Sequence, residues 1–194
     1  MHIGPSAPAV TEKYCAPAVA TLRATPTEET RGYVDINIRK ARLGDVEAIV
    51  DVTREFGREG IMIPLSIGDT LERLRAFQVA ELADGKIIGC VAVDATWDRL
   101  VEIRSLAVRR EYQQQQIGRK LVEAALKEAK QFGAEEVFTL TYVPDFFTRF
   151  GFRLIDRNTL PHKVWLVCVK CPKFPDCGES AMKMSLTGAQ DGTN

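Results

Sequence analysis

The chain of 194 residues lacks an excess of charge of either sign, because 26 lysine and arginine residues balance 26 aspartate and glutamate residues. A balanced charge gives no reason to expect nucleic acid or an anionic membrane as a general partner. No apolar run is long enough to cross a bilayer. The N-terminus also lacks the charged segment and apolar stretch of a secretory signal. These absences argue against the nucleic-acid-binding, membrane and secreted classes.

Cysteine is scarce, and its count of five is odd, which does not match the paired cysteines of a secreted disulfide framework. We therefore predict a reducing, cytoplasmic context. Cys90 stands in an apolar, strand-like run and is expected in the core.

Residues 1–35 have neither helical nor strand periodicity, and prolines are scattered among alanine, threonine and serine. This composition predicts a disordered N-terminal extension. A targeting peptide is the alternative, since acidic residues are scarce before Glu28, although basic residues are scarce too. Residues 188–194 are expected to form a tail.

Residues 36–187 carry the periodic patterns of a folded domain. Helical spacing of apolar residues predicts helices near residues 46–56, 69–77, 118–132 and 146–150. Alternating or continuous apolar runs predict strands at residues 36–39, 79–82, 86–95, 101–108, 137–142, 152–155 and 181–186. The order β-α-α-β-β-β-α-β-α-β-β predicts a single α/β domain, with a mixed central sheet and helices on both faces.

Two local features are predicted in more detail. Ala83-Asp84-Gly85 is typical of a hairpin turn between two strands. The second helix is expected to begin with Asp69 or Thr70 as its N-cap and to bury Leu71, Leu74 and Phe77.

Four glutamines in the stretch SLAVRREYQQQQIGRKLVEAALKEA, residues 105–129, lie between a predicted strand and a predicted helix. The free N–H groups and the dipole at a helix N-terminus attract anions. The pattern therefore predicts an anion-binding turn, and an ordinary polar connection is the alternative.

The turn resembles the acyl-CoA signature of the GNAT N-acetyltransferase superfamily. Gln113 and Gly118 match the signature, whereas Gln116 stands where the family usually has glycine. The segment FFTRFGF, residues 146–152, resembles a later GNAT segment, and the order of elements matches over most of the chain. The resemblance implies acetyl-CoA as co-substrate, bound by Leu106, Ala107, Val108, Gln113, Gln114, Gln115, Gln116, Ile117, Gly118, Arg119 and Phe147.

Three segments are similar to the short, stand-alone bacterial N-acetylglutamate synthases: EIRSLAV (102–108), LTYVPDFFTRFGF (140–152) and LPHKVWLVCVKCPKFPDCGESAM (160–182). This narrower resemblance implies acetyl transfer to the α-amine of L-glutamate, the first step of arginine biosynthesis, by direct attack on the thioester. The alternatives are another amine, such as L-glutamine, another amino acid or a protein lysine, and a non-catalytic acyl-CoA sensor. No acidic cluster is apparent in the sequence, which argues against a basic acceptor.

Candidate catalytic groups follow from the resemblance. Glu102, on an otherwise apolar strand, is the candidate general base, and an ion pair with Arg104 is its structural alternative. The Leu106 N–H is expected to polarise the thioester oxygen. Many GNAT enzymes have a tyrosine acid at the position of Phe147, and phenylalanine has no proton to donate. Either the thiolate leaves without that acid, or Tyr142 or a water molecule serves as the general acid. For Tyr142, a role as an amphipathic residue at the sheet edge is the alternative.

For the acceptor, Arg104 and Lys163 could pair with carboxylates, and Ser105 could add a hydrogen bond. The insert at residues 156–180 contains Cys168, Cys171 and Cys177, together with His162. We expect an irregular loop with reduced thiols, and a structural zinc site is the alternative. The sequence leaves the oligomeric state open, a homodimer included.

Overall fold

The computed structural model describes residues 34–162, 164, 168–169, 173 and 177–187, which belong to one unit that begins at Tyr33. Most of the predicted N-terminal extension, together with the tail at 188–194, lies outside the described residues. The predicted order of helices and strands is confirmed: β1 (Ile36–Lys40), α1 (Val46–Arg58), α2 (Ile67–Glu72), β2 (Phe77–Leu82), β3 (Ile87–Trp97), β4 (Leu100–Val108), α3 (Ile117–Gln131), β5 (Glu136–Thr141), α4 (Pro144–Thr148), β6 (Arg153–Leu154) and β7 (Ser180–Ser185).

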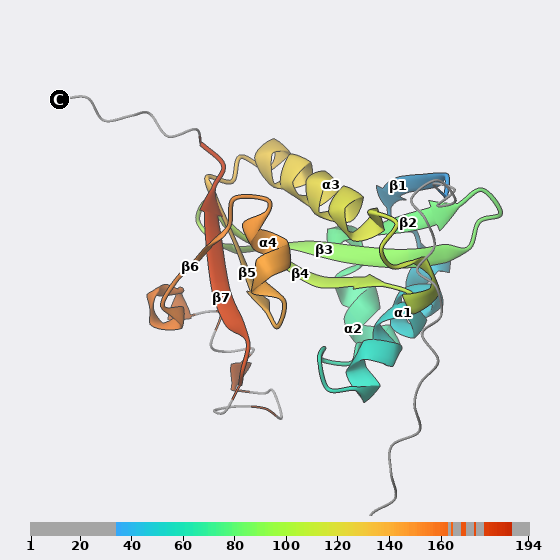
Figure 1. Ribbon diagram of the computed structural model, residues 1–194, viewed down its shortest axis with the longest axis horizontal. Helices are drawn as coiled ribbons and strands as arrows, with labels where there is room; N and C mark the ends of the chain where they lie inside the picture. Colours follow the sequence, from blue (N-terminus) through green and yellow to red (C-terminus); the bar gives the residue numbers. More distant parts are fainter. Residues whose placement is uncertain (1–33, 163, 165–167, 170–172, 174–176, 188–194) are drawn as a thin grey trace, which may run out of the picture. The chain divides into compact units, whose positions relative to one another are not determined.

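The strands form one seven-stranded sheet in the order β1-β2-β3-β4-β5-β7-β6. Neighbouring strands are antiparallel except β4 and β5, which are parallel, so the sheet is mixed as predicted. Helix α3 lies on one face of the sheet, while α1 and α2 lie on the other (Figure 1). Helices on both faces bury both surfaces of the central strands.

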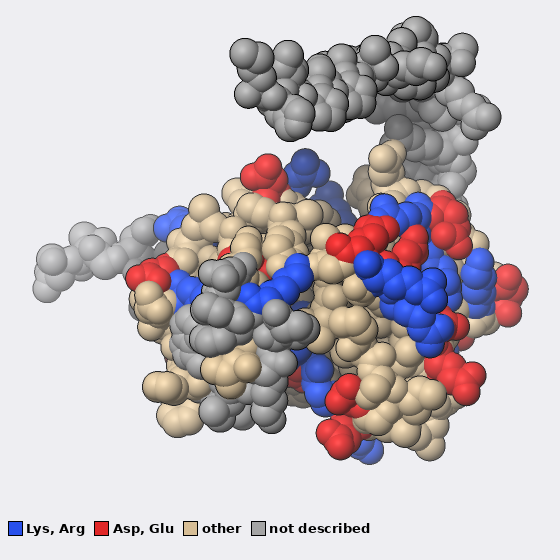
Figure 2. Space-filling model, turned by 90° about the horizontal axis from the view of Figure 1, so that it is seen from below, with Lys and Arg blue, Asp and Glu red and all other residues tan. Residues whose placement is uncertain are grey.

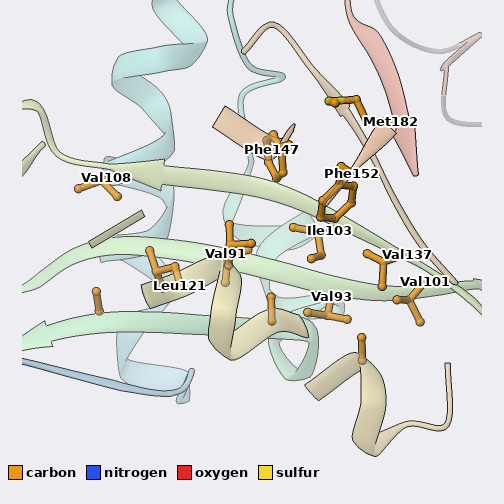
Figure 3. Close-up of a cluster of buried hydrophobic side chains, with 14 of the residues drawn as sticks. Val91, Val93, Val101, Ile103, Val108, Leu121, Val137, Phe147, Phe152 and Met182 are labelled. Carbon is orange, nitrogen blue, oxygen red and sulfur yellow. The ribbon is translucent and has the colours of Figure 1, made fainter. Parts of the chain in front are cut away.

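The core on the α3 face explains why that segment is helical. Leu121, Ala125 and Ala129 recur at a spacing of four, face the sheet and are fully buried. They belong to the same apolar cluster as Val91 of β3 and Ile103 of β4 (Figure 3). The hydrophobic stripe of one helix thus holds the two central strands on which the site is built.

A second cluster covers the opposite face. Ile49, Val52 and Phe56 of α1 pack with Val79 of β2 and Cys90 of β3. Cys90 is fully buried, as expected of a core thiol, and burial raises the pKa of that thiol to about 12.

The predicted hairpin turn is confirmed. Gly85 has φ +86°, a left-handed conformation that glycine adopts without strain. The Leu82 N–H donates to the Lys86 carbonyl at 2.9 Å, which closes the turn between β2 and β3.

The prediction for the second helix is wrong in its cap, in its end and in the burial of Leu71, whereas Phe77 is buried and Leu74 packs against the core as expected. Ser66 is the N-cap, and its hydroxyl accepts from the Asp69 N–H at 3.0 Å, so Asp69 lies inside the helix. Leu71 is exposed, and Phe77 opens β2 opposite Ala92 of β3. A serine-to-aspartate capping box and strand pairing therefore outweighed the apolar spacing.

No helix among the described residues combines the length and apolar character needed to span a membrane. The face shown in Figure 2 carries acidic and basic side chains side by side rather than a patch of one sign.

Candidate active site

The site originates where two parallel strands separate. β4 and β5 pair only from Leu100 opposite Glu136 to Glu102 opposite Phe138. β4 continues to Val108, so no strand of the described residues lies beside its second half on that side. A cleft with a volume of about 1660 Å³ opens there, and its walls include the β4 segment 102–108 and the end of β5.

A β-bulge changes the direction of the backbone in the part of β4 that has no β5 partner. The register with β3 shifts between Cys90 and Ala92, so that Ser105 and Leu106 together oppose one residue of β3. Ser105 adopts φ +53°, which is uncommon outside glycine, and its carbonyl accepts from the Cys90 thiol at 3.5 Å. The predicted Leu106 donor thus lies within an irregular segment at the free edge of the strand.

The glutamine turn closes one end of the cleft. The side-chain amide of Gln113 donates through Nε2 to the Val108 carbonyl at 3.1 Å, which ties the turn to β4. Gln114 and Gln116 have φ +64° and +61°, both in the left-handed region. Backbone that changes hand in successive residues can form an anion-binding concavity of N–H groups, here directly before α3. The left-handed conformation also explains physically why glycine suits the Gln116 position.

Gln115 differs from its neighbours in the turn. Gln113, Gln114 and Gln116 line the cleft, whereas Gln115 does not. The Gln115 Oε1 is buried and has no hydrogen-bond partner among the described residues. The structure therefore gives no reason to assign this side chain to the site.

The helix start packs closely against α4. A Cβ atom on Gly118 would lie 3.6 Å from Cζ of Phe146, which leaves room for a methyl group and no more in that direction. The neighbouring Phe147 is buried, with its ring edge-on to Phe146 at 5.1 Å and to Phe152 at 5.4 Å. Phe147 thus belongs to the buried apolar cluster (Figure 3) and also lines the cleft.

Glu102 lies where the strands separate. Its side chain is only 14% exposed and lines the cleft. Burial raises the pKa of this carboxyl, and the nearby Arg104 guanidinium, with an N–O distance of 3.6 Å, opposes the rise. A carboxylate that is buried but not held by a short ion pair can accept a proton closer to neutral pH than an exposed one.

Further charged groups surround Glu102. Asp94 lies opposite it on β3 and pairs with Arg73, while Glu179 precedes β7. Arg157 donates to the carbonyl of Glu179 and also lines the cleft. The expectation of no acidic cluster is therefore wrong, because Glu179, far along the chain, lies at the same end of the cleft as Asp94 and Glu102.

Tyr142 follows β5 on the opposite wall of the cleft. Its hydroxyl accepts from Lys173 Nζ at 2.8 Å and lies 4.0 Å from the Cys177 sulfur. Because an ammonium group can only donate, the hydroxyl keeps its own hydrogen for another acceptor. Lys173 also donates to the Gly60 carbonyl, so it links the loop after α1 to the end of β5.

Residues 51–152 match the model of the acetyltransferase (GNAT) family. The chain belongs to the GNAT acetyltransferase family. It is therefore an acyltransferase enzyme, and the expectation raised by the glutamine turn is confirmed at the level of the family.

Three similar proteins support this assignment. The uncharacterized N-acetyltransferase CT2212 of Chlorobaculum tepidum is 41% identical over 152 residues, which span 78% of this chain and 97% of that protein. An amino-acid acetyltransferase of Mycobacterium tuberculosis is 32% identical over 130 residues, 66% of this chain and 74% of that protein. The crystal structure of Rv2747 from Mycobacterium tuberculosis, in complex with CoA and NLQ, superposes with a TM-score of 0.67 at 30% identity, covering 77% of this chain and 99% of that chain.

This GNAT domain brings together some of the predicted acceptor residues. Arg104 and Ser105 both line the cleft beside Glu102. Lys163 lies outside the described residues. Arg73 and Arg157 are cleft cations that the sequence did not single out, because nothing in their local patterns distinguishes them from surface arginines.

The predicted zinc alternative gains no support in the part of the chain that the structure describes. No three His, Cys, Asp or Glu side chains there are placed to hold a metal ion. Cys168 and Cys177 are half-buried free thiols that line the cleft, and burial raises the pKa of Cys168. His162 is exposed, while Cys171 lies outside the described residues.

Proposed function

We propose that this GNAT enzyme transfers the acetyl group of acetyl-CoA to the α-amine of L-glutamate. The observation that carries the proposal is the buried Glu102 carboxylate within a group of alternating charges in the cleft. An amino acid presents an ammonium group next to a carboxylate. The carboxylates of the cleft can pair with that ammonium group, and the arginines of the cleft can pair with that carboxylate. Similarity to a protein named amino-acid acetyltransferase supports an acceptor of this class.

The residues at the other end of the cleft fit acetyl-CoA. The turn from Gln113 to Gly118 offers backbone N–H groups and the start of α3 to the pyrophosphate. The open edge of β4, from Leu106 to Val108, offers N–H and carbonyl groups to the pantetheine arm. The similar Rv2747 structure contains CoA, which agrees with this fit.

Glu102 serves as the general base in this proposal. It takes a proton from the α-ammonium group, directly or through one water molecule. The amine nitrogen then forms a bond to the thioester carbonyl carbon, and the Leu106 N–H stabilises the negative oxygen. As the C–S bond breaks, the nitrogen loses its second proton to solvent, and the Tyr142 hydroxyl supplies a proton to the departing sulfur. Solvent then replaces the Tyr142 proton and takes the proton held by Glu102.

Two carboxylates of glutamate need cationic partners. Arg104 and Arg157 flank Glu102 and Glu179 in the cleft, and Ser105 adds a hydroxyl group. Arginine suits this task because its planar fork can bind a carboxylate with two hydrogen bonds. With glutamate as acceptor, the product is N-acetylglutamate, which places the enzyme at the first step of arginine biosynthesis in the cytoplasm.

The test is to measure kcat/KM with acetyl-CoA for L-glutamate, L-glutamine, L-aspartate and L-lysine under one set of conditions. Thiol release gives the rate, and mass spectrometry of the product confirms the added acetyl group. We expect glutamate to be preferred, because a site built for two carboxylates leaves buried cations unpaired when one is missing. A faster reaction with glutamine would contradict glutamate as the acceptor, and the proposed acetyl transfer would still stand.

One observation favours a second candidate. The three carboxylates Asp94, Glu102 and Glu179 at the acceptor end would also attract an amine with a second positive charge. Acetylation of lysine or a lysine-containing peptide in preference to glutamate would support this candidate.

A further inference from the structure

Asp94 and Glu102 are direct partners across the antiparallel pair β3–β4. Side chains at partner positions project from the same face of the sheet, with Cβ atoms about 4.5–5.5 Å apart. Two carboxylates at such positions repel each other, so a bare pair would destabilise the sheet. A positive charge beside Asp94 is needed to offset this repulsion, so that Glu102 can be ionised and act as a base.

Arg73 supplies that offset. It lies at the C-terminal end of α2, and its Nη2 donates to Oδ2 of Asp94. Its guanidinium group also lies over the buried Phe77 ring, 5.8 Å from the centroid. The ring and the carboxylate together hold the cation next to the β3–β4 pair, and Arg73 and Asp94 both line the same cleft as Glu102.

We propose that Asp94 and Arg73 are positioning residues that act through Glu102, and that the balance of their two charges sets the pH at which Glu102 can accept the acceptor's proton. The inference rests on the proposed role of Glu102. Asp94 disfavours the charged form of Glu102, while Arg73 favours it and keeps Asp94 in place.

Other charged groups also face Glu102, and each stays constant in the comparison below. They are Arg104 on the same strand, Arg157 and Glu179 at the same end of the cleft, and the Cys168 thiol from the segment at residues 156–180. Because Asp94 and Arg73 carry charges of opposite sign, single variants at these two positions must shift the pKa of Glu102 in opposite directions. A purely structural role would lower activity in both without that pattern.

The experiment compares the pH dependence of kcat/KM for the acceptor, at saturating acetyl-CoA, in Asp94→Asn, Arg73→Met and the double variant. Activity requires ionised Glu102, so a lower pKa moves the acidic limb of the profile to lower pH. Asp94→Asn should therefore raise the relative rate on that limb by about threefold to tenfold, the effect of one charge near the site. Arg73→Met should lower it by about as much, and the double variant should lie near the wild type.

Asp51→Asn is the matched control, since it neutralises an aspartate that pairs with an arginine, Arg54, on the exposed side of α1 and outside the cleft. Its profile should match the wild type. Limbs that move in the same direction, or do not move, in Asp94→Asn and Arg73→Met would overturn the inference. In that case a profile that loses its acidic limb in Glu102→Gln would show that the proposed base itself still stands.

Discussion

Gln116 occupies a backbone position whose conformation conflicts with its residue type. Its φ of +61° and ψ of +11° are left-handed, directly before the first residue of α3. A side chain there costs roughly 1–2 kcal/mol relative to glycine, because the Cβ atom crowds the following carbonyl oxygen. The protein accepts this strain at the turn where N–H groups must point toward the cleft, which is typical of functional sites.

We expect Gln116→Gly to be more stable to unfolding than Gln116→Ala by about 1 kcal/mol. Both variants lack the glutamine side chain, and only the glycine relieves the backbone, so their difference isolates the strain. Urea denaturation measures the two free energies of unfolding. Acetyl-CoA binding by Gln116→Gly should equal or exceed that of the wild type, and a clear loss would show that the side chain itself contacts the ligand.

Glu102 owes its chemistry to burial. Its folded-state pKa is raised, so the carboxylate is ionised above that value and protonated as the pH falls through it. Glu102→Gln should therefore lower kcat by about a hundredfold or more and flatten the acidic limb of the pH–rate profile. Acetyl-CoA binding should stay near that of the wild type, since Glu102 lies away from the turn. An unchanged rate and pH profile would show that Glu102 is not the base and serves only in a structural ion pair with Arg104.

At the level of elements, the start of α3 decides whether the turn can approach a ligand. Gly118 lies in the first turn of that helix, near the Phe146 ring and the Val108 side chain. Glycine keeps this surface flat, and larger side chains would project into the cleft or against the ring.

Gly118→Trp should raise the dissociation constant for acetyl-CoA strongly, at least tenfold, which corresponds to about 1.4 kcal/mol. Gly118→Ala is the matched control, because a methyl group at 3.6 Å from Phe146 is an ordinary contact. Isothermal titration calorimetry measures both. If the tryptophan variant bound acetyl-CoA as tightly as the wild type, the turn would not be part of the binding site.

For the whole domain, a charged network joins the first strand to the sheet and to α1. Arg39 of β1 donates to Asp45 at 2.6 Å and to Glu81 of β2 at 2.7 Å, and its side chain is only 13% exposed. The hydrogen bond from Arg39 holds the pKa of Asp45 below its ordinary value. The ionised form of Asp45 therefore stabilises the fold, and that stabilisation is lost as the pH falls through the lowered pKa.

Asp45→Asn should lower the free energy of unfolding at pH 7 by about 1.5–3 kcal/mol, the usual range for a hydrogen bond to a charged group. The gap between variant and wild type should close in strongly acidic solution, where the wild-type carboxylate is protonated too. Urea unfolding at a series of pH values measures this gap. A gap that is constant with pH would assign the loss to packing instead.

Most of the architecture could be predicted because local patterns agree with the final structure. The apolar spacing of α3, the Gly85 turn and the strand–turn–helix around Gln113 are all set by near neighbours in the chain. The second helix was the exception. There, pairing of Phe77 with Ala92 of β3, a contact between distant residues, overrode the apolar spacing.

The sequence by itself determined the family, the order of helices and strands, and the turn at Gln113–Gly118, since each depends on neighbouring residues. The tertiary structure alone decided how the cleft is charged. Arg73 and Asp94 are 21 residues apart, Tyr142 and Lys173 are 31 apart, and Glu179 lies near Glu102 because β7 pairs with β5. Burial and long-range pairing create these contacts, and neither leaves a periodic signal in the chain.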